Sequence, residues 1–253
     1  MLESQVAAVY DAIAPEYADA FGATEPEQPL ELAMIDHLIA MLKRDLAAGA
    51  GTRAADGARA VDTRAAAAPP PSAGPARADP SCAPRVLDAG CGAGRLLPYL
   101  ESRGCQVTGI DIAGGMVAQA RRRHPTFGVS VGSLTRLPLA DAAFDAYVSW
   151  YSTIHLPVDG LSAALAEAAR VLRPGGRVLL AFQAGHGARD VARGMRSRHD
   201  VPPDAVLLRY HRTPDEVAAA LVAAGFVESA RLVRGPVDAE QDPQAVLVAT
   251  RGG

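Results

Sequence analysis

The segment from Val86 to Gly94, with the sequence V-L-D-A-G-C-G-A-G, constrains the fold of this chain more than any other feature. Its first residues are typical of a short buried strand, and its glycines predict a tight turn before a helix over residues 95–102. Glycines let backbone N–H groups approach a ligand closely, because no Cβ stands in the way. We interpret the segment as a strand–turn–helix unit that binds a ligand at its glycine turn.

The acidic residue before this turn, Asp88, indicates the kind of ligand. A dinucleotide-binding turn follows the pattern G-x-G-x-x-G, whereas Arg95 occupies the third glycine position of that frame here. Asp88 would also repel a pyrophosphate group bound at this place. A carboxylate beside a glycine turn favours a cationic ligand, such as one with an ammonium or sulfonium group.

Further segments downstream complete an α/β pattern. Asp111 ends a second strand about twenty residues beyond the first glycine, where an acid can accept both hydroxyls of a ribose. Alternation of strands with helices predicts a parallel sheet with right-handed crossovers. The expected strands of this region are 85–89, 105–111, 127–132, 143–150 and 176–183.

In this order the segments resemble the motifs of the S-adenosylmethionine (SAM)-dependent methyltransferases with a Rossmann-like fold, whose first motif reads D-x-G-x-G-x-G. The resemblance covers roughly residues 85–183. It implies a seven-stranded, mostly parallel α/β sheet with one antiparallel strand and helices on both faces. It also implies SAM as the cofactor and S-adenosylhomocysteine as its product. No metal is expected, because no pair of His, Asp or Glu residues has convincing ligand spacing.

The resemblance assigns contacts to each part of the cofactor. The glycine turn should surround the methionine part, and Asp111 should bind the ribose. Many relatives carry Asp where this chain has Ser133, which should meet the adenine edge through its hydroxyl. For Met116 the alternative is ordinary core packing, and for Tyr17 it is a staple between cap and core. The residues expected to bind the cofactor are Tyr17, Asp88, Gly90, Gly92, Gly94, Asp111, Ile112, Met116, Ser133, Leu134 and Trp150.

The segment after the fourth expected strand, W-Y-S-T-I-H, carries the candidate catalytic residues. Active sites of open parallel sheets lie outside the carboxyl ends of the strands. We predict that His155 is a general base if the acceptor must lose a proton, and that Tyr151 lines the same cavity. The alternatives are a structural role for His155 as a helix cap or wall, or a base supplied by His186, His199 or His211.

Composition divides the chain into three parts. Residues 1–48 are predicted to form an N-terminal helical cap over the ligand end of the sheet, with helices at 3–21, restarted at Pro15, and 29–47. Residues 49–84 are rich in Ala, Pro and Gly and almost lack large apolar side chains, which predicts a flexible insertion. The core should span 85–253, with a lid at 184–212.

The net charge of −3 and the pI of about 6.1 give no basic footprint for nucleic acid. No apolar run is long enough for a membrane span, so we expect a cytoplasmic monomer or homodimer whose partner is a small-molecule methyl acceptor. The resemblance extends to bacterial secondary-metabolism methyltransferases that transfer a methyl group to O, N or C. The alternatives are a SAM-binding enzyme for cyclisation or rearrangement, and a SAM-binding regulatory module.

Overall fold

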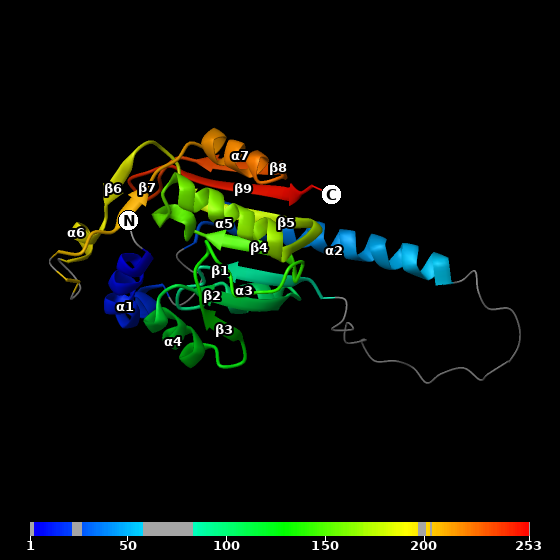
Figure 1. Ribbon diagram of the computed structural model, residues 1–253, viewed down its shortest axis with the longest axis horizontal. Helices are drawn as coiled ribbons and strands as arrows, with labels where there is room; N and C mark the ends of the chain where they lie inside the picture. Colours follow the sequence, from blue (N-terminus) through cyan, green and yellow to red (C-terminus); the bar gives the residue numbers. More distant parts are fainter. Residues whose placement is uncertain (1–2, 22–26, 58–82, 197–200, 203, 253) are drawn as a thin grey trace, which may run out of the picture.

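The computed structural model describes residues 3–21, 27–57, 83–196, 201–202 and 204–252. Its centre is a seven-stranded sheet with the strand order β3-β2-β1-β4-β5-β9-β8 (Figure 1). Strand β9 is antiparallel to both of its neighbours, and the other neighbouring pairs are parallel. The predicted α/β sheet with one antiparallel strand is therefore confirmed. The strands are β1 Arg85–Ala89, β2 Gln106–Asp111, β3 Gly128–Val131, β4 Phe144–Trp150, β5 Leu172–Gln183, β8 Phe226–Arg234 and β9 Gln244–Arg251.

Helices cover both faces of this sheet, as the resemblance implies. Alternate residues of the fully buried strand β4 point to opposite faces. Tyr147 packs into the apolar cluster that contains helices α5 (Val158–Val171) and α7 (Pro214–Ala223). Val148 packs into the cluster on the other face, with α2 (Pro29–Gly57) and α3 (Leu97–Ser102). Because both faces of the sheet are covered, all residues of β4 are buried and the strand shows no alternation of buried and exposed positions.

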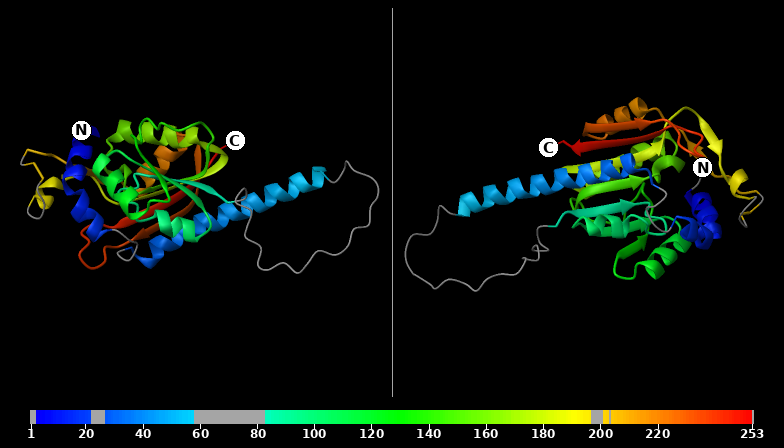
Figure 2. Two further views of the ribbon diagram at one scale, coloured as in Figure 1. Left: turned by 90° about the horizontal axis from the view of Figure 1, so that it is seen from below. Right: turned by 180° about the vertical axis from the view of Figure 1, so that it is seen from behind.

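The position of α2 differs from the prediction that both N-terminal helices cap the ligand end. Figure 2 shows α2 lying along one face of the sheet, away from α1 (Glu3–Ala20). Its apolar stripe, which includes Leu38 and Leu42, packs against apolar side chains of β4, β5 and β9. The apolar stripe of α2 therefore covers this face of the sheet. Of the two N-terminal helices, α1 is the one whose side chains line the cavity at the ligand end.

Helix α1 is continuous across Pro15, where the sequence predicted a restart. A proline inside a helix removes one backbone hydrogen bond and tends to kink the helix. Here Pro15 is exposed, whereas Ile13, Ala14 and Ala18 are buried against the core. Burial on both sides of the proline holds the two halves of the helix on one surface.

Helix α2 continues to Gly57, past the boundary at residue 48 that composition suggested. Residues 58–82 lie outside the described part of the chain, so the division into cap, insertion and core stays a prediction. None of the described helices is long and apolar enough to cross a bilayer.

The segment 184–212 contains short elements that the sequence did not predict. Strands β6 (Ala188–Asp190) and β7 (Leu208–Tyr210) form an antiparallel pair, and α6 (Ala192–Met195) follows β6. They lie at the same end of the molecule as α1, and Leu207 packs into one apolar cluster with α1 (Figure 1). The segment therefore borders the ligand end. Its role as a lid stays a prediction, and His199 falls outside the described residues.

Candidate cofactor and acceptor site

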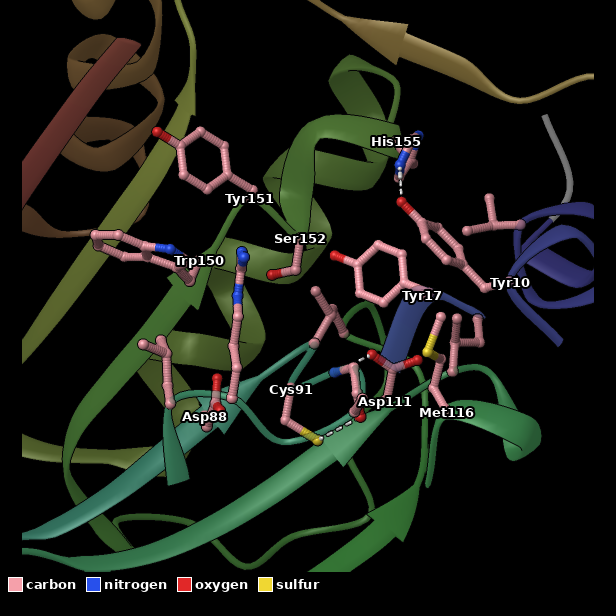
Figure 3. Close-up of a pocket in the computed structure, with 18 of the residues that line it drawn as sticks. Tyr10, Tyr17, Asp88, Cys91, Asp111, Met116, Trp150, Tyr151, Ser152 and His155 are labelled. Atoms are coloured by element: carbon pink, nitrogen blue, oxygen red, sulfur yellow. Dashed lines mark hydrogen bonds between the residues drawn. The ribbon is translucent and has the colours of Figure 1, made fainter. Parts of the chain in front are cut away.

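A cavity lies at the carboxyl ends of β1, β2 and β4, beneath α1 (Figure 3). It holds about 900 Å³ of empty space, its open mouth included. The topology therefore brings the predicted residues to one place, although they come from many separate helices, strands and loops. The predicted residues that line it are Tyr17, Asp88, Gly90, Gly92, Asp111, Ile112, Met116, Leu134, Trp150, Tyr151 and His155.

Two residues that were predicted to bind the cofactor do not line the cavity. Gly94 has a φ of +89°, and a Cβ there would lie 2.9 Å from both His124 Cδ2 and Leu97 Cδ1, so glycine is required for turn geometry and helix packing. The Ser133 hydroxyl donates a hydrogen bond to Glu3 Oε1 at 2.6 Å, which ties α1 to the core. Both residues therefore stabilise the structure around the site.

The glycine turn needs its first two glycines for different reasons. At Gly90, where φ is +81°, a Cβ would lie 2.1 Å from the Cβ of Ser152. Ser152 is fixed by a 2.5 Å hydrogen bond that its hydroxyl donates to the Ala89 carbonyl. At Gly92, where φ is +54°, the nearest atom to a Cβ would be Tyr17 Cε1 at 3.9 Å. A side chain at Gly92 would fill the gap between the turn and α1.

Asp88 is buried, and its Oδ2 atom has no hydrogen-bond partner among the described residues. The pKa of Asp88 is raised from 3.8 to about 7, chiefly by burial; Arg95 opposes the shift, and nearby Asp111 contributes to it. A buried carboxylate without a partner costs free energy unless a donor or cation reaches it. The side chain faces the cavity, so the geometry favours a cationic group of a ligand at this point.

The Asp111 carboxylate is held by the backbone at the end of β2. Its Oδ2 accepts a hydrogen bond from Gly92 N at 2.8 Å, and its Oδ1 accepts one from Ala113 N at 2.9 Å. Burial raises the pKa of Asp111, and these backbone hydrogen bonds oppose the shift. Each oxygen keeps a further lone pair. The carboxylate is therefore oriented and can still accept hydrogen bonds from two ligand hydroxyls.

An ion pair that the sequence analysis missed lies beside Asp88. Among the described residues that line the cavity, Arg95 is the one Lys or Arg side chain. Its Nη1 atom is 2.5 Å from Glu27 Oε1, and the Trp150 indole donates to the second Glu27 oxygen at 3.0 Å. Arg95 directly follows the glycine motif, which was the available signal, whereas nothing in the sequence marked Glu27.

Tyr151 lines the cavity, but its hydroxyl turns away from it. The hydroxyl donates a 2.9 Å hydrogen bond to the buried Glu31 of α2. Arg234 of β8 contacts the same Glu31 oxygen at 2.7 Å. Tyr151 has a φ of +57°, an uncommon backbone conformation for a bulky residue. The hydroxyl therefore anchors α2 and β8, and the catalytic role of Tyr151 stays a prediction.

His155 ends η2 (Thr153–His155) and is buried with both ring nitrogens engaged. Nε2 is 2.8 Å from the hydroxyl of Tyr10 in α1, and Nδ1 is 2.8 Å from the Leu208 carbonyl oxygen in β7. Burial lowers the pKa of His155 to about 4. The imidazole is neutral at physiological pH, and it joins three elements. Tyr10, which lies in the predicted helix 3–21, was not among the predicted site residues.

Metal chemistry finds no support within the described part of the chain, where no group of three or more His, Cys, Asp or Glu side chains could hold an ion. The site instead presents the buried carboxylate of Asp88 and the half-buried carboxylate of Asp111, near one arginine that Glu27 already neutralises. This charge distribution favours an organic cation over an anion.

Residues 86–176 match the family model described as a methyltransferase domain. The chain carries a methyltransferase domain. The matched segment contains β1 to β4 and the glycine turn, so it coincides with the residues that build the floor of the cavity. The family that the sequence resembled is therefore confirmed for this domain.

Curated relatives agree with this assignment. The malonyl-[acyl-carrier protein] O-methyltransferase of Enterobacter lignolyticus is 41% identical over 98 residues, which cover 39% of this chain and 38% of the relative. The demethylmenaquinone methyltransferase of Beutenbergia cavernae is 40% identical over 97 residues, which cover 38% and 40%. The chain thus spans about two fifths of the length of these relatives, and the likeness is confined to the methyltransferase domain.

Solved structures share the fold over a longer stretch. A SAM-dependent methyltransferase from Methanosarcina mazei superposes with a TM-score of 0.58 at 21% identity, covering 67% of this chain and 93% of that one. The 1,6-didemethyltoxoflavin-N1-methyltransferase of Burkholderia thailandensis, solved with S-adenosylhomocysteine and its substrate, has a TM-score of 0.54 at 24% identity and coverage of 68% and 72%. These likenesses confirm the α/β methyltransferase fold.

Proposed function

We propose that this chain binds SAM in the cavity beneath α1 and transfers its methyl group to a small molecule. The observation that carries the proposal is the buried Asp88 carboxylate, whose Oδ2 lacks a partner beside a glycine turn in a methyltransferase domain. The α-ammonium group of SAM would supply the missing donor, and charge-assisted hydrogen bonds of this kind are strong.

The remaining contacts follow the shape of SAM. Arg95 keeps guanidinium N–H groups beyond the one that faces Glu27, and these would meet the carboxylate of the methionine part. Asp111 would accept hydrogen bonds from the two ribose hydroxyls. Ile112, Met116 and Leu134 give the adenine ring apolar walls. Tyr17 of α1, which stands opposite Gly92, would close the cavity over the cofactor.

When bound, SAM supplies an activated methyl group, so the chain mainly has to align the acceptor and exclude water. The apolar and aromatic side chains of Val6, Tyr17 and Leu156 line the same cavity as His155. His155 is deprotonated at neutral pH. We therefore assign the end of the cavity at His155 to the acceptor.

A small molecule fits a cavity that is roofed by α1 and bordered by residues 184–212. The relatives are named for acceptors as different as a malonyl group on acyl-carrier protein and demethylmenaquinone. Their names therefore support methyl transfer without choosing among O, N and C acceptors. We retain a secondary metabolite as the proposed acceptor class and the cytoplasm as the proposed location.

Turnover distinguishes this function from the two alternatives, a SAM-dependent cyclisation or rearrangement and a regulatory SAM-binding module. We would incubate the protein with SAM carrying a ¹³C-labelled methyl group and with separate pools of phenols, amines and carboxylic acids. Methyl transfer predicts S-adenosylhomocysteine together with a product that carries the label. Bound SAM that stays intact with every pool would contradict the proposed function and leave the two alternatives.

A further inference from the structure

The acceptor end of the cavity contains a row of hydrogen bonds with a fixed direction. A carbonyl oxygen can only accept, so the 2.8 Å contact between His155 Nδ1 and the Leu208 carbonyl places the proton on Nδ1. The neutral ring then has a lone pair on Nε2, which must accept the hydrogen bond from the Tyr10 hydroxyl. The row therefore runs from Tyr10 through His155 to the backbone of β7.

This direction decides which group can meet an acceptor. The lone pair on His155 Nε2 is already occupied by the Tyr10 hydroxyl, as the dashed line in Figure 3 shows. The Tyr10 oxygen donates its hydrogen to His155 and keeps lone pairs that can accept another hydrogen bond. Tyr10 also lines the cavity. An acceptor that enters the cavity would therefore find a hydrogen-bond acceptor at Tyr10.

We propose that Tyr10 and His155 act together as the base of a hydroxyl-directed methyl transfer, with Tyr10 taking the proton of the acceptor and handing its own proton to His155. This inference rests on the proposed SAM-dependent activity and names the acceptor class of the same site. The acceptor is a neutral, flat molecule with a phenolic hydroxyl, which fits the ring of Tyr17 and the apolar wall of Val6 and Leu156.

Atoms and charge balance in this step. A lone pair of the acceptor oxygen forms the new C–O bond while the C–S bond breaks and its electron pair stays on sulfur. The acceptor's O–H bond breaks as that proton joins the Tyr10 oxygen, and Tyr10's original proton forms a bond to Nε2. The products are a methyl ether, a neutral thioether and the imidazolium of His155. One positive charge enters as sulfonium and one remains as imidazolium, so the buried site never gains net charge.

The charged and titratable groups around Tyr10 and His155 are compatible with this proton transfer. The charged or titratable groups that face it are Tyr17 of α1, Arg209 of β7, Asp111 after β2 and Arg95 after the glycine turn. Burial holds His155 neutral before the reaction, when the sulfonium would repel an imidazolium. A hydroxyl gains most from such a base, because its oxygen is a weak nucleophile until its proton leaves.

Glu3 is the rival base, because it also lines the cavity. Its Oε1 atom accepts hydrogen bonds from the hydroxyls of Ser133 and Thr135, at 2.6 and 2.7 Å. These contacts anchor the start of α1 to the loop after β3. The two candidates are separated by comparing Tyr10→Phe with Glu3→Gln, since each removes one base and keeps the shape of its side chain.

The kinetic test uses the full chain, SAM and a series of phenols from 4-nitrophenol, which is largely ionised near neutral pH, to 4-methoxyphenol, which is not. We expect Tyr10→Phe to lower kcat for 4-methoxyphenol about 100-fold or more and kcat for 4-nitrophenol less than about tenfold. His155→Gln should show the same pattern, and the double variant should lose no more than either single variant. The matched control is Tyr99→Phe. The Tyr99 hydroxyl donates to Asp36 of α2 and Tyr99 does not line the cavity, so this variant should stay within about twofold.

A second readout does not depend on turnover. The ¹⁵N spectrum of the S-adenosylhomocysteine complex at pH 7 should show the Nδ1–H tautomer of His155, and Tyr10→Phe should displace the Nε2 resonance only. A proton on Nε2, equal losses for both phenols, a larger loss in Glu3→Gln, or no phenol methylated by protein that binds SAM would each overturn the inference. Failure to bind SAM would instead overturn the proposed function itself.

Discussion

At the scale of single residues, the site depends on a carboxylate that is costly for the empty protein. The folded-state pKa of Asp88 is raised to about 7, so the folded protein is more stable when this carboxyl group is protonated. The stability contributed by this group is present at low pH and is lost as pH rises through about 7. A group that destabilises the empty protein and faces a cavity is explained by ligand binding more readily than by folding.

Asp88→Asn tests whether Asp88 lowers the stability of the empty protein and strengthens ligand binding. The amide cannot ionise, so we expect the ligand-free variant to melt a few degrees higher than the wild type at pH 8, with the difference shrinking toward pH 5. Its affinity for SAM should fall at least about tenfold, because a charge-assisted hydrogen bond is lost. Thermal melts with and without SAM measure both effects. A variant that melts lower at pH 8 and binds SAM normally would contradict the role of Asp88.

The affinity for SAM should also depend on pH. The ammonium group of SAM pairs with the ionised form of Asp88, whose pKa in the empty protein is about 7. Below that pH, binding must expel a proton, so we expect affinity at pH 6 to be about tenfold lower than at pH 8. Calorimetry at pH 6 in buffers of different ionisation enthalpy measures the released proton. Buffer-independent heat at that pH would contradict the coupling.

The sequence predicted part of this site and missed another part for a physical reason. Asp88 and Asp111 stand at the ends of strands that local patterning predicts, and parallel strands bring their carboxyl ends together. Tyr10 and Glu27 lie far from the motif, and only the docking of α1 and α2 brings them to the cavity. Tertiary contacts of this kind leave no local signal in a single sequence.

At the scale of elements, α1 provides a cap for a neighbouring helix. Helix α4 (Gly114–Arg123) begins after Ala113, which offers no side-chain cap, and Gly115 N donates instead to Asp11 Oδ1 of α1 at 2.6 Å. By contrast, α7 carries its own capping box, in which Thr213 and Glu216 exchange hydrogen bonds, as its sequence predicts. The first cap depends on tertiary docking, and the second is local.

This difference leads to a prediction about coupling between α1 and SAM. Asp11→Ala should remove about 1 kcal/mol of capping free energy and, because α1 roofs the cavity, weaken SAM binding by up to about fivefold. Thr213→Ala should lower stability by a similar amount without changing SAM affinity. Asp11→Asn should restore both properties. Thermal melts and binding isotherms of the three variants test this coupling. Equal SAM affinities in all of them would show that the docking of α1 does not influence ligand binding.

At the scale of the whole molecule, the described contacts place the core in α1, the first half of α2 and the sheet with its helices. Residues 58–82 consist largely of Ala, Pro, Gly and charged residues. Replacing them with a Gly/Ser linker of the same length should therefore keep the melting temperature within about 2 °C and SAM affinity within about twofold. A larger loss would show that this stretch contributes to the fold or to the site.

The central claim is that the cavity beneath α1 is a SAM site, and calorimetric titration with SAM and S-adenosylhomocysteine tests it most directly. The account predicts micromolar binding of both ligands to the wild type and loss of at least about tenfold in Asp88→Asn and Asp111→Ala, each of which remains folded. No heat with either ligand in a folded wild-type sample, or unchanged binding in both variants, would contradict it.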